Sequence, residues 1–176
     1  MSHKNQANIL AKECMVTALM KLVQTKPLSS ISISEITEFA GVSRMTYYRN
    51  YSSKEEIFKI YMDEIIQSFK QDVSVWVDKG FYNNYQNIVH CFEYFSRYKD
   101  FINCLISVGM GDMMLSALSN YVLDAYFKDS SDMKFYYTLQ AYAGSLYNTY
   151  ISWITNQAKE SGEDMAQMIY DIYKQK

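Results

Sequence analysis

Proline and glycine are scarce in this chain of 176 residues, which contains one proline and six glycines. Folds rich in strands need many turns, and these two residues are the ones that turns most often require. Their scarcity therefore favours long helices joined by short connections. No alternation of apolar and polar residues lasts beyond four positions, and no internal repeat or low-complexity tract is present. The sequence predicts an all-α fold.

Apolar residues recur at helical spacing along most of the chain, and polar or glycine-containing breaks divide them into segments. One long helix is expected to start near Lys54 and to run to about Asp78. The other helices are expected at residues 7–25, 33–40, 44–51, 84–98, 100–107, 112–127, 132–158 and 163–175.

The composition excludes several classes of protein. Hydrophobic residues make up 49% of the chain and charged residues 20%, which is typical of a folded globular protein. No run of about 18 apolar residues occurs without charge, so we expect no contact with a membrane. The three cysteines lack metal-finger spacing, and the first residues lack the apolar segment of a secretory signal. We expect a cytoplasmic protein without a metal or a cofactor.

The charge is distributed unevenly along the chain. Residues 1–60 contain eight Lys or Arg and five Glu, a net charge of +3. Residues 61–176 contain nine Lys or Arg and fourteen Asp or Glu, a net charge of −5. A basic first third on an acidic remainder is the distribution expected of a polyanion-binding unit attached to a larger domain.

Residues 32–51 predict a helix-turn-helix, which is a pair of short helices joined by a tight turn. Ser32 and Glu35 have the spacing of a capping box, in which each side chain bonds the backbone amide of the other residue. Gly41 stands where a helix end favours positive φ, and Ser43 can cap the second helix. Tyr47 lies four residues before a second tyrosine, so both should face inward and anchor that helix. In this motif the second helix enters the major groove of DNA.

The side chains that should face outward between residues 43 and 54 suit a DNA surface. Arg44 can donate to a guanine edge or to phosphate, while Met45 and Thr46 can pack against thymine methyl groups. Arg49 is expected to meet phosphate more often than a base. A helix-turn-helix that does not bind DNA remains an alternative at this stage. The candidate DNA-binding residues are Ser32, Ser43, Arg44, Met45, Thr46, Tyr48, Arg49, Asn50 and Lys54.

Residues 15–58 resemble the N-terminal domain of tetracycline-repressor-type (TetR) transcription regulators. The resemblance rests on Ile33, Ile36, Ala40-Gly41-Val42-Ser43, Thr46, Tyr48, Tyr51 and Ser53-Lys54-Glu55. Residues 140–170 are similar to the last two helices of a subgroup of the same family, through Gly144, Trp153, Ile154 and Met165-Ala166.

The resemblance implies a helix-turn-helix DNA-binding domain at residues 1–60 and a helical ligand-binding and dimerisation domain at residues 61–176. It implies a homodimeric repressor that binds an inverted-repeat operator in double-stranded DNA and is released by a small-molecule effector. Tyr48 and Lys54 match positions that the family uses on phosphate. Met45 and Asn50 depart from the residues that are frequent at their positions, so the operator sequence is not predictable.

The last two predicted helices are the expected dimer interface, because each has a broad apolar face and the first has small residues that permit close approach. The candidate interface residues are Tyr142, Gly144, Leu146, Trp153, Met165, Met168 and Ile172. The alternative is that these apolar stripes pack within one chain.

The resemblance also implies an effector pocket among the middle helices, for which the candidate residues are Trp76, His90, Tyr94 and Tyr98. Aromatic walls suit a flat or cationic ligand, although residues of these types more often belong to the core.

Two other functions are alternatives to DNA binding. Catalysis is not expected, because His90 and Cys91 are adjacent on a helix and diverge by about 100°, and no catalytic motif is present. The other alternative is a coactivator module that binds a protein partner with the same fold and does not bind an operator on its own.

Overall fold

The structure is a computed structural model of the whole chain, and it describes residues 3–74, 80–128 and 130–174. Within these ranges the chain forms nine α-helices, one short 3-10 helix and no strand, which confirms the predicted all-α fold. The elements are α1 (His3–Leu22), η1 (Leu28–Ser30), α2 (Ile33–Phe39), α3 (Arg44–Asn50), α4 (Lys54–Ser74), α5 (Tyr85–Ser96), α6 (Lys99–Ser107), α7 (Asp112–Tyr126), α8 (Met133–Thr155) and α9 (Gly162–Tyr173).

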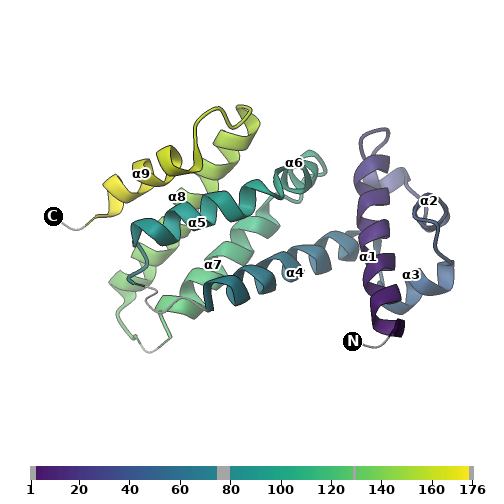
Figure 1. Cartoon of the computed structure of the whole chain (residues 1–176), viewed down its shortest axis with the longest axis horizontal. Coiled ribbons are helices and arrows are strands. Elements are labelled where there is room, and N and C mark those ends of the chain that lie inside the picture. The colour runs from purple at the N-terminus through teal and green to yellow at the C-terminus, as the bar shows by residue number, and fades with distance from the viewer. Residues whose placement is uncertain (1–2, 75–79, 129, 175–176) are drawn as a thin grey trace.

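The helices α1, α2 and α3 form a small bundle at one end of the molecule, as Figure 1 shows. Its interior consists of fully buried side chains from all three helices, among them Met15, Leu19, Ile36 and Tyr47. Tyr51, directly after α3, is also buried. The prediction that the two tyrosines face inward and anchor α3 is therefore confirmed.

The long helix α4 connects this bundle to the remaining helices (Figure 1). One face of α4 is buried along its whole length, from Ile57 and Phe58 to Phe69 and Val73. It contacts α1 near its start and α7 near its end. One continuous helix therefore connects the α1–α3 bundle to the other helices.

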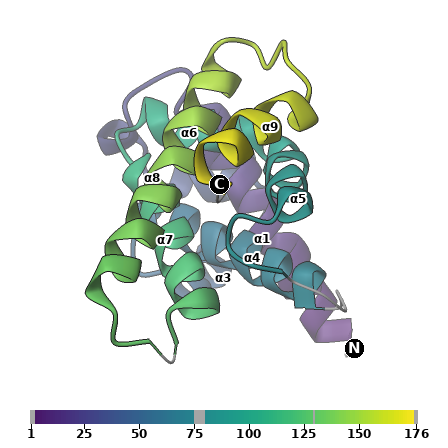
Figure 2. The ribbon, with the colours of Figure 1, turned by 90° about the vertical axis from the view of Figure 1, so that its left-hand side faces the viewer.

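The helices α5 to α9 form the body of the protein. In this body α7 packs along α8 (Figure 2), and α9 packs along α5 and also contacts α8. No helix in the described part of the chain is both long enough and apolar enough to cross a lipid bilayer.

Four residues that the sequence assigned to a dimer interface lie inside the chain instead. Tyr142, Leu146, Trp153 and Met165 are all buried, and the ring of Trp153 lies 5.8 Å from that of Phe92 on α5. The reason is that α9 and α8 cover α5, so most of their apolar surface is already used within one chain. The assignment of these four residues to a dimer interface is therefore wrong. For them the alternative is correct, which is that the apolar stripes pack within one chain.

Candidate nucleic-acid interface

The two helices of the motif are capped by serine side chains. Ser32 accepts a hydrogen bond from the Glu35 amide at 3.3 Å, and the Glu35 carboxylate accepts one from the Ser32 amide at 2.9 Å. Ser43 accepts a hydrogen bond from the Thr46 amide at 3.1 Å. Gly41 has φ of 66° in the turn between the helices, a conformation that a side chain disfavours. The predicted capping box and turn are confirmed.

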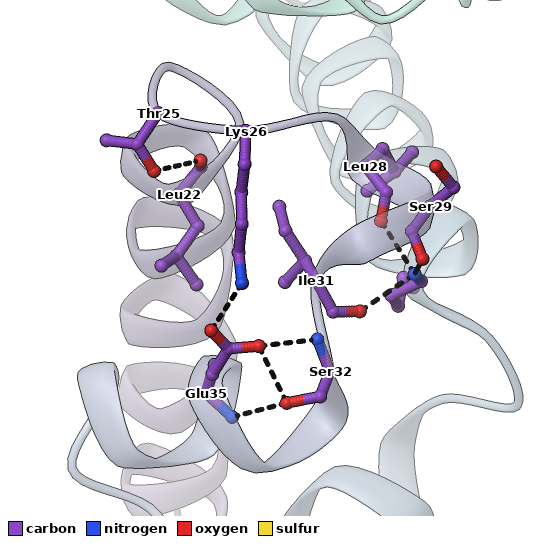
Figure 3. Close-up of polar contacts among 9 residues, drawn as sticks. Leu22, Thr25, Lys26, Leu28, Ser29, Ile31, Ser32 and Glu35 are labelled. Atoms are coloured by element: carbon purple, nitrogen blue, oxygen red, sulfur yellow. Dashed lines mark hydrogen bonds and ion pairs between the residues drawn. The ribbon is translucent and has the colours of Figure 1, made fainter.

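A second contact strengthens the start of α2. Lys26 forms an ion pair with Glu35, whose carboxylate also accepts from the amide and hydroxyl groups of Ser32 (Figure 3). The Lys26 hydrogen bond, followed by those from Ser32, lowers the pKa of Glu35 to about 2. The carboxylate is therefore charged at neutral pH. Its negative charge interacts favourably with the positive N-terminal end of the α2 dipole and stabilises the helix.

One side of α3 projects into solvent. Met45 is 76% exposed and Tyr48 is 62% exposed, and the side chains of Arg44 and Arg49 are exposed on the same helix. Tyr47, between them, is fully buried. The buried tyrosine fixes the rotation of the helix, and this rotation sets the direction in which the outward side chains project.

Arg44 has no hydrogen-bond or ion-pair partner among residues 3–74, 80–128 and 130–174. The neighbouring hydroxyl groups of Ser43 and Thr46 are hydrogen-bonded to each other at 3.0 Å. The first turn of α3 thus presents a charged donor, an apolar thioether at Met45 and a pair of hydroxyl groups. These groups match the donors and apolar contacts that read base edges in the major groove.

Asn50 is oriented toward α1 and not toward solvent. Its amide group exchanges two hydrogen bonds of 3.1 Å with the amide group of Asn8, and it also donates to the Thr46 carbonyl at 2.8 Å. Arg49 donates to the same Asn8 oxygen at 3.2 Å. This revises the sequence-based role of Asn50, because its amide is occupied in holding the end of α3 against α1. Asn8 was not predicted, since no motif links positions 42 residues apart.

Lys54 also has partners within the chain. Its ammonium group donates to the backbone carbonyls of Leu28, Ser29 and Ile31, at 2.6, 3.3 and 2.8 Å. A lysine ammonium has three hydrogens, so these three acceptors occupy all of them. The sequence-based assignment of Lys54 to phosphate is therefore revised in this structure.

Comparison with known protein families agrees with this arrangement. The profile of the bacterial regulatory proteins of the tetR family matches residues 16–60, which include α2, α3 and the start of α4. A second profile, described as the C-terminal region of TetR transcriptional regulators, matches residues 82–175. The chain belongs to the TetR family. It is a transcriptional regulator with an N-terminal helix-turn-helix and a helical C-terminal region.

Solved structures of similar fold agree with the assignment to the TetR family. A TetR transcriptional regulator from Streptococcus agalactiae is 21% identical with a TM-score of 0.67, and the match covers 98% of each chain. The dihydroxyacetone kinase operon activator DhaS is 18% identical with a TM-score of 0.61, over 93% of this chain and 94% of that one. The fatty acid degradation regulator FadR from Bacillus halodurans is 12% identical with a TM-score of 0.56, over 92% and 93%. No curated protein sequence matches the chain.

The body of this TetR protein encloses a small space between α4, α5, α7 and α8, which we call the inner chamber. It has a volume of about 30 Å³, which is room for about two water molecules. A wider groove of about 690 Å³ lies outside it and shares Val73, Tyr121 and Tyr126 with it. The inner chamber is lined by Phe69, Val73, Tyr82, Asn87, Cys91, Leu118, Tyr121, Val122, Tyr126, Tyr142 and Leu146.

The chamber lining is apolar except for phenol groups, one amide and one thiol. Burial raises the pKa of Cys91 to about 12, so this thiol is protonated at neutral pH. Burial also raises the pKa of Tyr142 well above its usual value. The chamber thus offers neutral hydrogen-bonding groups and aromatic surface.

None of the described residues that the sequence assigned to an effector pocket lines this chamber. The ring of His90 is stacked on Phe69 at 5.5 Å and Nε2 lies 3.2 Å from a carboxylate oxygen of Asp72. The Tyr94 hydroxyl donates to the Ile65 carbonyl on α4 at 3.2 Å. Tyr98 lies against Tyr94, with ring centroids 5.6 Å apart.

The separation of these residues from the chamber has a geometric reason, and their assignment to an effector pocket stays a prediction. His90 and Tyr94 are four residues apart and face α4, whereas the chamber is reached by Asn87 and Cys91, which are four apart on a neighbouring face of α5. Trp76, the fourth candidate, lies outside the described residues.

Proposed function

We propose that this TetR-family protein is a dimeric repressor that binds an inverted-repeat operator through α3 and is released by a small-molecule effector. The observation that carries the proposal is the outward side of α3, where Arg44, Met45, Tyr48 and Arg49 are exposed on a helix fixed by a buried tyrosine. Exposed apolar and cationic side chains on a rigid helix suit contact with base edges and phosphates.

Within this proposal, Arg44 reads a base and Tyr48 and Arg49 contact phosphate. Ser32 and Ser43 cap their helices and lie at helix N-termini, where a phosphate is stabilised by the helix dipole. Thr46 and Met45 supply contacts to thymine methyl groups.

A test of the base-reading role needs a duplex that the protein itself selects from a random-sequence library. Replacing Arg44 by alanine should weaken binding to that duplex by about 1–3 kcal/mol and relax the base preference at one position of each half-site. Lys159→Ala, which removes an exposed cation between α8 and α9, serves as the control and should change neither property. Equal losses by Arg44→Ala on selected and scrambled duplexes would refute base reading.

The dimer is proposed to form through the faces of α8 and α9 that the chain itself leaves uncovered. Met168 and Ile172 on α9 are 55% and 70% exposed, and Tyr137 on α8 is exposed as well. Gly144 is half-buried, and an added Cβ there would meet no atom within 4 Å. The glycine is therefore not required by packing inside the chain, and it leaves space for the backbone of a second copy to approach.

The effector is proposed to enter through the groove and to occupy the inner chamber, displacing the side chains between them. Tyr142 lines the chamber, and no described residue exchanges a hydrogen bond with its hydroxyl group. A ligand that combines an aromatic or aliphatic body with a neutral polar group fits this lining. Ligand binding would shift α4, and with it the separation of the two α3 helices in the dimer.

A coactivator role is the competing proposal, and a similar fold occurs in a protein named as an operon activator, DhaS. Library selection separates the two functions. Enrichment of a duplex by the pure protein supports operator binding, whereas enrichment that requires a second regulator supports the coactivator role.

A further inference from the structure

The connection between α1 and α2 is held by a lysine from a different helix. Lys54 is the first residue of α4, and its ammonium group reaches back to the carbonyls of Leu28 and Ile31 at 2.6 and 2.8 Å, and to that of Ser29 at 3.3 Å. These carbonyls belong to η1 and to the residue that follows it. One side chain thus fixes the whole short helix.

The other end of the same connection is held by an ion pair between Lys26 and Glu35. Ile31 leads directly into Ser32, the cap of α2, and Glu35 binds both Ser32 and Lys26. The connection is therefore tied to α4 on one side and to α2 on the other, as Figure 3 shows. Together these contacts set the position at which α2 begins.

The geometry around Lys54 is specific for an ammonium group. The start of a helix has a positive partial charge that disfavours a nearby cation, and the three carbonyl oxygens offset it. An ammonium group directs three hydrogens to separate acceptors, whereas the flat guanidinium of arginine directs its hydrogens in one plane. A planar guanidinium group is therefore poorly suited to the carbonyls of Leu28, Ser29 and Ile31, two of which lie in η1 and one directly after it.

We propose that Lys54 is a positioning residue for DNA binding, which orders the α1–α2 connection so that Ser32 and α2 are presented to the duplex, without itself contacting phosphate. The proposal rests on the DNA-binding function proposed above. The positioning role differs from a direct contact with phosphate, because all three hydrogens of the Lys54 ammonium group already have acceptors within the chain. It differs from a purely structural role because it requires a loss of affinity in protein that is fully folded.

The experiment compares Lys54→Met and Lys54→Arg in the full chain, with Lys59→Met as the control that removes an exposed cation from the same helix. Two properties are measured for each protein: the melting temperature without DNA, and the affinity for a selected duplex at several salt concentrations well below the melting temperature. A lost phosphate contact lowers the slope of log affinity against log salt by about 0.9 per protomer, whereas lost positioning does not.

We expect Lys54→Met to melt about 3–8 °C lower than the wild type and to bind on the order of tenfold more weakly, with the salt slope of the Lys59→Met control. Lys54→Arg should resemble Lys54→Met in both properties, because both variants lose the contacts to the carbonyls. The positive charge that arginine retains should not restore either property. A slope reduced by about 0.9 beyond the control, with arginine restoring affinity, would establish a phosphate contact and overturn the proposal. Unchanged affinity in a variant that melts lower would also overturn it.

A measurement on the wild-type protein covers the case in which the Lys54 variants fail to fold. The ammonium signals of Lys54 are followed by NMR while the selected duplex is added. Persistence of these signals at their original shifts supports the proposal, and transfer of the ammonium to a phosphate, seen as coupling to phosphorus, refutes it. If the wild-type protein selects no duplex at all, the proposed function itself fails, a result distinct from either of these.

Discussion

At the scale of single residues, two tyrosines with identical chemistry have opposite surroundings. Tyr47 is fully buried and its hydroxyl has no hydrogen-bond partner in the described part of the chain. Tyr150 is also buried, but its hydroxyl donates to the Phe95 carbonyl at 2.8 Å. A buried polar group without a partner is destabilising, whereas one that is hydrogen-bonded contributes modest stability.

Replacing each tyrosine by phenylalanine should therefore shift stability in opposite directions. Tyr47→Phe should raise the free energy of unfolding by about 1 kcal/mol, and Tyr150→Phe should lower it by a similar amount. Urea denaturation of the two variants measures both changes, and each variant is the control for the other. A loss of stability in Tyr47→Phe equal to that in Tyr150→Phe would show that the Tyr47 hydroxyl has a partner.

The Glu35 carboxylate gives a prediction about pH. Its pKa falls from 4.5 to about 2 on folding, mainly through Lys26 and then through Ser32. A lowered folded-state pKa means that the carboxylate contributes stability above pH 4.5, and that this contribution is lost as the pH falls from 4.5 toward 2. Urea midpoints of the wild type and of Glu35→Gln should therefore differ at neutral pH and converge in acid. Glu38→Gln, on the same short helix, is the control and should match the wild type throughout.

At the scale of helices, the sequence predicted most elements because their signals are local. Capping serines, the glycine at position 41 and the apolar spacing placed nine helices with ends that differ by no more than four residues from the structure, where the structure describes them. These features depend on neighbours within a few positions, so periodicity and capping patterns are sufficient to find them.

The parts that sequence reasoning missed depend on contacts between distant segments. Nothing near Asn8 indicates that it pairs with Asn50, and nothing near Lys54 indicates that three carbonyls lie within its reach. The apolar stripes of α8 and α9 were found correctly, but periodicity cannot show whether such a stripe faces a second copy or α5. For the same reason periodicity cannot show which face of α5 lines the inner chamber.

The end of α8 gives a prediction about helix termination. Gln157 has φ of 71°, in a turn where its amide donates to the Ile154 carbonyl and the Ala158 amide donates to the Trp153 carbonyl. This is the Schellman pattern, in which glycine is strongly preferred at the position of Gln157. Gln157→Gly should therefore raise the free energy of unfolding by about 1 kcal/mol, or the melting temperature by about 2–4 °C.

The matched control for Gln157→Gly lies one position earlier. Asn156 has φ of −90°, an ordinary backbone conformation, so Asn156→Gly should lower the melting temperature. Calorimetry measures the melting temperatures of the two glycine variants. A lower melting temperature in both would show that the backbone at Gln157 is not strained.

At the scale of the whole molecule, the proposed dimer predicts a change in mass. The chain has a mass of 20.6 kDa, and we expect sedimentation at micromolar concentration to give twice that value. Ile172→Glu should dissociate the dimer, because a charge would be buried opposite a second apolar surface. Since Ile172 is 70% exposed in one chain, the variant should keep its helical circular-dichroism spectrum. Leu10→Glu changes an exposed side chain of α1, far along the chain from α8 and α9. This variant is the control and should remain dimeric.

The central claim is that the outward side of α3 binds a DNA duplex, and amide-perturbation mapping by NMR tests it most directly. Addition of a selected duplex should shift the amides of residues 43–49 and of Ser32, and it should leave the exposed face of α9 near Met168 unchanged. Perturbations confined to other surfaces, with residues 43–49 unaffected at saturating duplex, would contradict the account.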